Sequence, residues 1–213
     1  MRPARDWKGF YFITDSRLTM NGILEDVRQA LSAGAVMIQY REKEAPYSAR
    51  REEAACLLEI CRAHGTPFVV NDDVELAAEI GADGVHLGQL DLPLREARRA
   101  LGEGAIIGIS AGGVEDSRAA ERDGADYVSA SPVFATPTKP DAGPPLGLEG
   151  LARIRAATRL PLVAIGGLHA GNVRSAVEAG ADMVCAISAS LAGGKVAENI
   201  RALLRAMSGA RTD

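Results

Sequence analysis

Three polar side chains alternate along the short stretch QYREK in the first quarter of the chain. Gln39, Arg41 and Lys43 stand two residues apart, so in an extended strand they lie on the same face. Two cations one repeat apart repel each other unless an anion lies between them, and both side chains are good ligands for phosphate oxygens. The stretch predicts an anion site, and solvated cations balanced by Glu42 and Glu44 are the plainer alternative.

Carboxyl and amide groups follow the next two apolar runs. Asn71 and Asp72 end the run PFVVND, and Gln89 and Asp91 follow the run IGADGVHL. Mg²⁺ carrying a diphosphate takes a few hard oxygen ligands from the protein and leaves room for water and phosphate oxygens. We therefore predict that Asp72 and Asp91 ligate Mg²⁺ next to the cations. The structural alternatives are an N-cap at Asn71 or Asp72, and a network of ion pairs that satisfies itself.

Hydroxyl groups mark the middle of the chain. Ser110 ends the run AIIGIS, and the loop VFATPTKPDAGPP, residues 133–145, contains Thr136, Thr138 and Lys139. Its four prolines make it neither a helix nor a central strand. Long loops in compact domains are often lids or binding loops, although a connection without function is the alternative. We predict that this loop contacts the substrate and is more ordered when substrate is bound.

Glycines and a serine follow the last two apolar runs. Gly166 and Gly167 end the run PLVAIGG, and Ser188 follows the run AGADMVCAI. Backbone N–H groups at such glycines can approach a ligand closely, and the segment after Ser188 is predicted to start a short helix. In a (β/α)8 barrel, the loops after the seventh and eighth strands form a recurrent phosphate site. These residues therefore predict a second anion site, suited to a monophosphate.

No residue in these groups has the surroundings of an activated nucleophile. Cys185 falls inside an apolar run and is predicted to be packed core. The three histidines lack metal-binding spacing, and His86 and His169 are open as acid–base groups. Diphosphate binding without a nucleophile predicts ionisation of a diphosphate leaving group, with the departing charge stabilised by metal and cations.

The elements that must position these groups come from a repeated pattern. Eight apolar runs occur along the chain, and four of them begin with one residue followed by glycine and alanine. Amphipathic segments such as ILEDVRQALSAG and GLEGLARIRAATR stand between them. Eight such units in 213 residues predict one (β/α)8 TIM barrel of the α/β class over residues 1–213. The rival is a doubly wound sheet, but the expected GxGxxG after the first strand is missing from TDSRLTMNG.

Composition limits the function classes. The hydrophobic fraction is 47%, the net charge is −4, and the three cysteines form no CxxC pair. An acidic balance argues against nucleic acid as a partner, and no apolar stretch is long enough for a membrane span. The cysteine pattern argues against a disulfide framework or a structural zinc site. We expect a soluble cytoplasmic protein with small-molecule substrates and no membrane partner; a homodimer is left open.

The order of these motifs resembles the thiamine-phosphate synthase family. QxRxK at 39–43, ND at 71–72, DGVHLGQLD at 83–91, GIS at 108–110, PVFATPTK at 132–139, VAIGGL and AISAS follow one another along nearly the whole chain. The resemblance implies a (β/α)8 barrel that joins 4-amino-5-hydroxymethyl-2-methylpyrimidine diphosphate to a thiazole phosphate, with or without a carboxylate. It also implies a dissociative mechanism, in which diphosphate leaves before the thiazole nitrogen captures the pyrimidine cation.

The resemblance also implies a role for each matching residue. The diphosphate is held by Arg41, Lys43, Asn71 and Lys139. Mg²⁺ is ligated by Asp72 and Asp91. The aminopyrimidine is contacted by Gln39 and Ser110. The thiazole phosphate is held by Thr136, Thr138, Gly167, Ile187 and Ser188. Arg41, Lys43, Ser110 and Lys139 form the implied catalytic set.

Two residues depart from the family pattern, and two other functions remain open. Ser131 and Met183 stand where the family usually has glycine, which makes a close backbone approach at residue 131 doubtful. A thiazole tautomerase of the sister family would share the thiazole phosphate end but would not need the diphosphate cluster. A non-catalytic regulator that binds a phosphorylated ligand is the alternative outside the enzymes.

Overall fold

Eight short parallel strands pair in chain order and close into a barrel, because the last strand also pairs with the first. The computed structural model describes residues 7–138 and 143–209. The strands are β1 (Gly9–Ile13), β2 (Met37–Tyr40), β3 (Phe68–Asn71), β4 (Gly84–Leu87), β5 (Ile106–Ala111), β6 (Tyr127–Ala130), β7 (Leu162–Ile165) and β8 (Met183–Cys185). The predicted (β/α)8 TIM barrel is confirmed. Its extent over 1–213 stays a prediction, because both chain ends lie outside the described residues.

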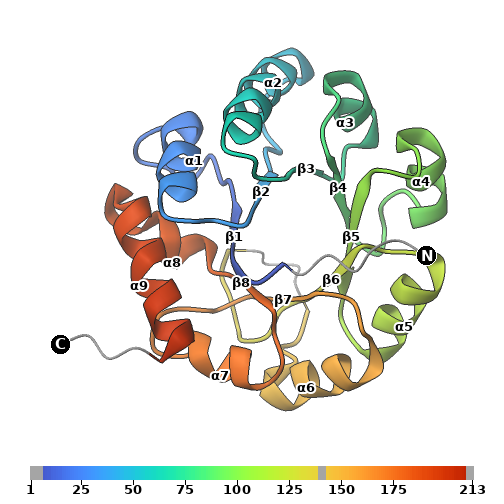
Figure 1. Cartoon of the computed structure of the whole chain (residues 1–213), viewed down its shortest axis with the longest axis vertical. Helices are drawn as coiled ribbons and strands as arrows, with labels where there is room; N and C mark the ends of the chain where they lie inside the picture. The colour runs from blue at the N-terminus through green and yellow to red at the C-terminus, as the bar shows by residue number, and fades with distance from the viewer. Residues whose placement is uncertain (1–6, 139–142, 210–213) are drawn as a thin grey trace.

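Helices follow the strands and surround the barrel (Figure 1). They are α1 (Ile23–Ser32), α2 (Tyr47–Ala63), α3 (Val74–Ile80), α4 (Leu94–Leu101), α5 (Val114–Asp123), α6 (Gly147–Ala157), α7 (Val173–Glu178), α8 (Ile187–Leu191), η1 (Ala192–Gly194) and α9 (Val196–Ser208). The short helix expected after β8 is α8, and it begins one residue before Ser188. Within the described chain, none of the helices combines the length and the apolar character that crossing a membrane requires.

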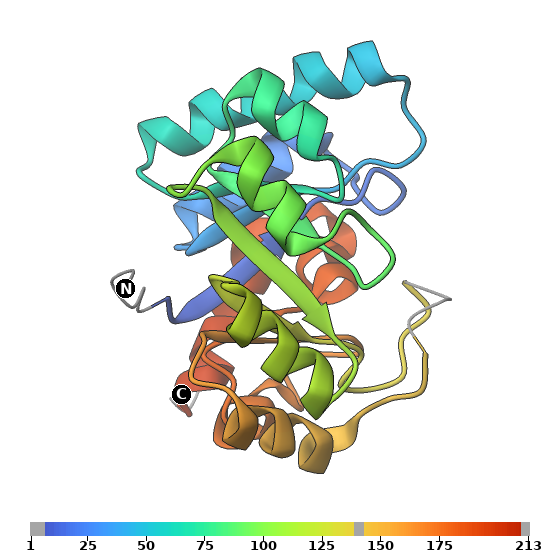
Figure 2. The same cartoon turned by 90° about the vertical axis from the view of Figure 1, so that its right-hand side faces the viewer.

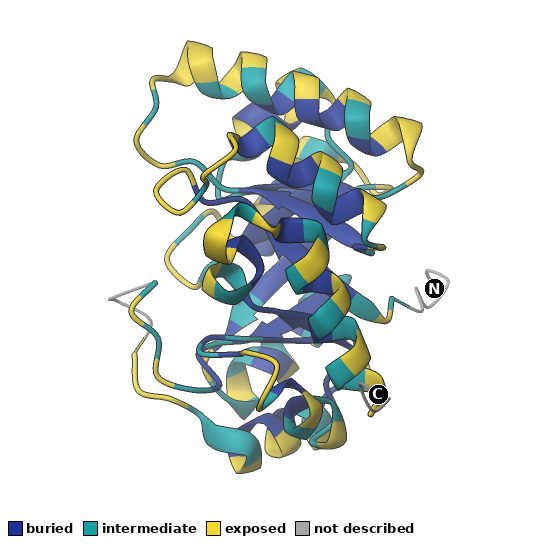
Figure 3. Cartoon of the chain, turned by 90° about the vertical axis from the view of Figure 1, so that its left-hand side faces the viewer, coloured by how far each residue is buried: buried dark blue, intermediate teal, exposed yellow. Residues whose placement is uncertain are grey.

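Alternation along the strands divides the apolar residues into two cores. On β1, Phe10 and Phe12 belong to the large core between the strands and the helices. Tyr11 and Ile13 belong to a smaller cluster inside the barrel, against which Trp7 packs. Both faces of the strands are therefore buried, and the exposed residues lie on the loops and on the outer faces of the helices (Figure 3). This explains why the strands appear in the sequence as continuous apolar runs.

The repeated glycine–alanine–aspartate triplet ties strands together where they begin. In each triplet the aspartate Oδ2 accepts a hydrogen bond from a backbone N–H of a preceding strand, and its own N–H donates to the carbonyl of the same residue. The pairs are Asp83 with Phe68, Asp126 with Ile107, and Asp182 with Leu162. We call this end of the barrel the amino-terminal rim. The first repeat has Val36 in place of aspartate and makes only the backbone bond, to Phe10.

Two arginines complete the amino-terminal rim from the helices. Arg98 Nη2 lies 2.8 Å from Asp126 Oδ2, and Arg155 Nη1 lies 2.9 Å from Asp182 Oδ2. Each guanidinium also donates to two backbone carbonyls nearby. The Arg98–Asp126 pair is nearly buried, with side chains 10% and 6% exposed. Buried charges are tolerated when they are paired and hydrogen-bonded in this way.

The opposite end of the barrel, where the strands finish, carries the longer loops. In Figure 2 the arrow of β5 points toward the loop between β6 and α6, and β1 starts at the other end. That loop has no helix or strand over residues 131–138 and 143–146. We call this end the carboxyl-terminal rim, which is where (β/α)8 barrels place their active sites.

Candidate active site

A cavity of about 480 Å³ opens at the carboxyl-terminal rim. It is lined by every predicted site residue that the structure describes, namely Gln39, Arg41, Lys43, Asn71, Asp72, Asp91, Ser110, Thr136, Thr138, Gly167, Ile187 and Ser188. Lys139 lies outside the described residues. Residues from all parts of the sequence thus meet in one place, whereas the role of each stays a prediction.

Gln39, Arg41 and Lys43 meet at the cavity, but the predicted reason, that they alternate along one strand, is wrong. The strand ends at Tyr40, so only Gln39 is a strand residue, and it is buried. Arg41 and Lys43 belong to the loop that follows. Both cations still line the cavity, because parallel strands bring their following loops to the same rim.

The end of β1 holds Arg41 in place. Thr14 Oγ1 accepts a hydrogen bond from the Arg41 N–H at 2.8 Å and donates to the Arg41 carbonyl at 3.2 Å. Asp15 Oδ2 lies 3.5 Å from Arg41 Nη1, and the Asp15 side chain is only 1% exposed. Thr14 and Asp15 were not among the predicted site residues, although a polar pair directly after a strand is the signal that singled out Asn71 and Asp72.

Two carboxylates face each other beside Lys43. Asp72 Oδ2 lies 3.2 Å from Lys43 Nζ, and Asp91 Oδ2 accepts a hydrogen bond from the Gly88 N–H at 2.7 Å. Burial raises the pKa of the Asp91 carboxyl, and the hydrogen bond with Asp72 and the negative charge of Asp72 raise that pKa further. The predicted neighbourhood of the two aspartates is therefore present, with like charges that oppose each other.

The backbone at Asp72 adopts a conformation that few side chains tolerate. Its φ of 63° is the one positive φ among the non-glycine residues that the structure describes. The alternative that Asn71 or Asp72 caps a helix is wrong, because Asp73 is the N-cap of α3 and accepts from the Leu76 N–H. Asp72 is thus held at the cavity in a left-handed conformation that does no capping, and such outliers cluster at functional sites.

A chain of buried hydrogen bonds crosses the floor of the cavity. Gln39 Nε2 donates to the Tyr11 hydroxyl at 2.7 Å, and that hydroxyl lies 2.7 Å from the Tyr127 hydroxyl. Tyr127 lies 3.0 Å from His86 Nδ1, and His86 Nε2 lies 3.0 Å from Ser110 Oγ. We call these five residues the buried chain. It joins the two residues predicted to contact the aminopyrimidine.

Of the two histidines considered as acid–base groups, only His86 lies at the cavity. His86 lies in β4, lines the cavity and is nearly buried, whereas His169 is an exposed residue that accepts from the Gly171 N–H. The sequence analysis missed Tyr11 and Tyr127. The signal available was a tyrosine at an inward position of a barrel strand, since a buried hydroxyl needs a partner.

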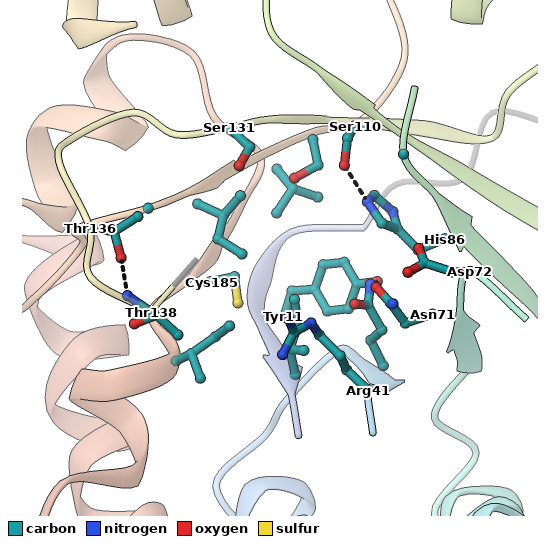
Figure 4. Close-up of a pocket in the computed structure, with 18 of the residues that line it drawn as sticks. Tyr11, Arg41, Asn71, Asp72, His86, Ser110, Ser131, Thr136, Thr138 and Cys185 are labelled. Carbon is teal, nitrogen blue, oxygen red and sulfur yellow. Dashed lines mark hydrogen bonds between the residues drawn. The ribbon is translucent and has the colours of Figure 1, made fainter. Parts of the chain in front are cut away.

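The other side of the cavity is formed by the loop after β6 and by the ends of β7 and β8. In Figure 4, Thr136 and Thr138 lie on one side, Asp72 and His86 lie on the other, and Cys185 lies between them. The Thr138 N–H donates to Thr136 Oγ1 at 3.3 Å. The two predicted anion sites are therefore on opposite sides of one cavity.

Gly167 lets the loop after β6 approach the end of β7. Its φ is 63°, and a Cβ there would lie 2.5 Å from the carbonyl oxygen of Ala135 and 2.8 Å from Cβ of Phe134. The Phe134 N–H also donates to the Gly166 carbonyl at 3.0 Å. A glycine is thus required here by the backbone, which leaves its predicted contact with a phosphate untested.

The two departures from the family pattern have different surroundings. Ser131 lines the cavity and donates its backbone N–H to Ala111. Met183 is fully buried in the cluster inside the barrel, where it packs with Cys185 among others. Cys185 is buried as predicted, and burial raises the pKa of its thiol far above its ordinary value.

Known proteins resemble this chain over nearly its whole length. The family model described as thiamine monophosphate synthase matches residues 10–190. A thiamine-phosphate synthase of Moorella thermoacetica is 44% identical, covering 96% of this chain and 98% of that protein. One of Methanosarcina barkeri is 45% identical, covering 84% of this chain and 81% of that protein.

A solved structure agrees with the sequence comparisons. The thiamine phosphate pyrophosphorylase from Pyrococcus furiosus superposes with a TM-score of 0.86 and 37% identity, covering 94% of this chain and 96% of that one. The family model, the relatives and the fold therefore point the same way as the motifs at the cavity. The chain belongs to the thiamine monophosphate synthase family.

Proposed function

We propose that the protein joins 4-amino-5-hydroxymethyl-2-methylpyrimidine diphosphate to a thiazole phosphate, releasing diphosphate and forming thiamine phosphate. The observation that carries this proposal is the cavity with two sides, one lined by Arg41, Lys43 and facing carboxylates, the other by threonines and glycine. A coupling enzyme must bind two anionic substrates next to each other. Membership of the family supports the same activity.

The diphosphate is assigned to the side of the cavity that Arg41 and Lys43 line. Thr14 fixes the backbone of Arg41 and Asp15 contacts its guanidinium, so that the guanidinium offers its donors in a defined direction, which suits the oxygen atoms of a diphosphate. Lys43 can exchange its contact with Asp72 for phosphate oxygens, because the pair is partly exposed to solvent. Asn71 adds an amide at the same side.

Asp72 and Asp91 fit the requirements of Mg²⁺. Their carboxyl groups are close enough to hydrogen-bond to each other, and two hard oxygen ligands are the number that Mg²⁺ takes when phosphates and water supply the rest. The described residues contain no group of three or more His, Cys, Asp or Glu that could hold a metal without the substrate. When bound, Mg²⁺ would neutralise charge on the diphosphate as it leaves.

The thiazole phosphate is assigned to the opposite side. Thr136, Thr138 and Ser188 offer hydroxyls, and the start of α8 and Gly167 offer backbone N–H groups. The proposed coupling requires that the thiazole nitrogen point toward the pyrimidine. N–H groups and hydroxyls can hold a monophosphate, and the Arg17 guanidinium donates to the Thr138 carbonyl at 3.4 Å.

The chemistry follows from what the cavity does with charge. Arg41 and Lys43 stabilise the negative charge that develops on the diphosphate, while the aminopyrimidine ring delocalises the positive charge that remains. Gln39 and Ser110 orient that ring. Cys185 lines the cavity, but burial raises the pKa of its thiol so far that it stays protonated. A dissociative reaction, captured by the thiazole nitrogen, is therefore the mechanism that we propose.

The coupling assay with purified protein tests the proposed function. The two substrates with Mg²⁺ are expected to give thiamine phosphate and diphosphate, and excess chelator is expected to stop the reaction. A protein that only isomerises a thiazole phosphate would be a tautomerase and would contradict the proposal. We further propose a cytoplasmic site of action, which the three free thiols support.

A further inference from the structure

The buried chain has a direction. Gln39 Nε2 donates to Tyr11 at one end, so Tyr11 has its own hydrogen left for Tyr127. The distances alone allow either group of each later pair to be the donor; if each link holds one hydrogen, Tyr127 donates to His86 Nδ1 and His86 Nε2–H donates to Ser110 Oγ. In this arrangement each link holds one hydrogen atom. The Ser110 hydroxyl hydrogen and the Gln39 carbonyl oxygen are then left for a ligand, beside the second N–H of the Gln39 amide.

The two end groups have opposite character. Ser110 offers a hydroxyl hydrogen to the cavity, and Gln39 offers its carbonyl oxygen. If the chain ran the other way, Ser110 would offer only lone pairs and Gln39 its amide hydrogens. An aminopyrimidine has ring nitrogens that accept hydrogen bonds and an amino group that donates them. It can therefore satisfy both ends at once.

The interior of the barrel keeps the chain intact. Burial raises the pKa of Tyr11 and of Tyr127 well above the ordinary value of a tyrosine, so both hydroxyls keep their hydrogens at neutral pH. The Tyr127 ring stacks on His86 and meets Tyr11 edge-on. At Gly108 a Cβ would lie 1.9 Å from the Tyr127 ring. A glycine at that position is thus what makes room for the central hydroxyl.

We propose that Tyr11, Tyr127 and His86 are positioning residues that make Ser110 a hydrogen-bond donor and Gln39 an acceptor toward the aminopyrimidine. This inference rests on the proposed function. As the diphosphate leaves, positive charge spreads to the amino group and strengthens its N–H groups as donors. An acceptor already fixed at Gln39 then stabilises the cation more than the substrate, which accelerates the reaction.

Tyr127→Phe tests the proposal, because Tyr127 is fully buried and does not line the cavity in the described structure. We expect kcat to fall about tenfold, the size of effect that a lost buried hydrogen bond has on a transition state. The KM for the thiazole phosphate should stay unchanged. Tyr11→Phe breaks the same chain at the next hydroxyl and should give the same pattern if Tyr127→Phe does not fold.

Tyr40→Phe is the matched control. It removes a buried hydroxyl that donates to Glu53 on the outer side of the barrel, so it should lower Tm by a similar amount and leave kcat unchanged. Equal kcat losses in Tyr40→Phe and Tyr127→Phe would mean that the buried chain has only a structural role. A Tyr127→Phe enzyme with the kcat of the wild type would also overturn the proposal.

A double variant separates action through Ser110 from a general disturbance. If Tyr127 acts through Ser110, adding Tyr127→Phe to Ser110→Ala should lower kcat by much less than tenfold, and losses that simply multiply would contradict the inference. A wild type that forms no thiamine phosphate would contradict both the proposed function and this inference. An active wild type with an unimpaired Tyr127→Phe would contradict the inference alone.

Discussion

The two rims of the barrel differ in how they use pairs of charged side chains that include aspartate. At the amino-terminal rim, Asp126 accepts from a backbone N–H and from Arg98, and both side chains are nearly buried. At the carboxyl-terminal rim, Asp72 and Asp91 lie next to each other at the cavity; burial raises the pKa of Asp91, and the hydrogen bond with Asp72 and its negative charge raise that pKa further. Charges that satisfy one another stabilise the fold, whereas charges that oppose one another are suited to an added ligand.

The largest expected effect lies at the carboxyl-terminal rim. Arg41→Ala removes a cation from the predicted diphosphate site, so we expect kcat/KM for the coupling to fall about 100-fold or more, as when one fixed donor to a developing negative charge is lost. Steady-state kinetics measure this loss. Arg41→Lys keeps a positive charge near Asp15 but loses the fork of donors. Its kcat/KM should lie between those of Arg41→Ala and the wild type.

Thiazole phosphate binding tells whether Arg41 acts on one side of the cavity alone. Calorimetry with the thiazole phosphate should give nearly the same affinity for Arg41→Ala as for the wild type, because its predicted ligands are on the opposite side. A collapse of that affinity would contradict the division of the cavity into two anion sites.

The amino-terminal rim should respond in stability and leave the chemistry intact. Arg98→Ala removes the ion pair between Arg98 and the buried Asp126, and breaking such a pair costs about 3 kcal/mol of unfolding free energy. Arg155→Ala should cost less, since the side chains of Arg155 and Asp182 are each 26% exposed. Denaturant unfolding measures both losses. A kcat/KM that falls in either folded variant would show that the two rims are not separate.

The fold could be predicted from the sequence because it depends on repeated local patterns. Strands buried on both faces appear as apolar runs, and glycines such as Gly81 and Gly124 end helices in the left-handed conformation. The triplet with aspartate recurs because it makes the same pair of backbone hydrogen bonds at Asp83, Asp126 and Asp182. Each βα unit makes the same local interactions, so the same residue types recur along the sequence.

The candidate site could be predicted only in part, because its contacts are not local. Residue types after the strands indicated Arg41, Asp72 and the other predicted site residues, but neither Tyr11, which also lines the cavity, nor the contacts that hold Arg41. The hydroxyls of Tyr11 and Tyr127 meet although 116 positions separate them. No spacing along the chain reports such a contact, and the short strand at residues 37–40 ended before the alternation that had been assumed for Arg41.

A substitution at Asp15 should have a smaller effect on kcat/KM than Arg41→Ala, and it can be compared with a matched substitution at the amino-terminal rim. Asp15→Asn keeps an oxygen for the Arg17 N–H but removes the charge beside Arg41. We expect a loss of about tenfold in kcat/KM, mainly through KM for the pyrimidine diphosphate, because a freer guanidinium binds less well. Asp182→Asn is the matched control at the amino-terminal rim and should leave kinetics unchanged. Equal kinetic losses in both variants would refute a positioning role for Asp15.

The smallest expected effect is on the Tm of Asp91→Asn relative to the wild type, which should be higher in chelator and lower in Mg²⁺. Its pKa in the folded protein is raised, so its ionisation opposes folding at pH values above that pKa, and this destabilisation disappears as the pH falls below the pKa of the unfolded chain. In chelator at neutral pH, Asp91→Asn should therefore raise Tm by a few degrees (about 1 kcal/mol is about 2–4 °C at this size). The difference should shrink at acid pH.

Adding Mg²⁺ should reverse that order. A ligand that binds only the folded state raises Tm, and the wild type has both carboxylates for Mg²⁺ whereas Asp91→Asn keeps only Asp72. Thermal unfolding with chelator and with Mg²⁺, each in the presence of diphosphate, measures the reversal. A variant less stable than the wild type in chelator at neutral pH would show that Asp91 stabilises the fold, as the aspartates of the amino-terminal rim do, and would remove the distinction between the two rims.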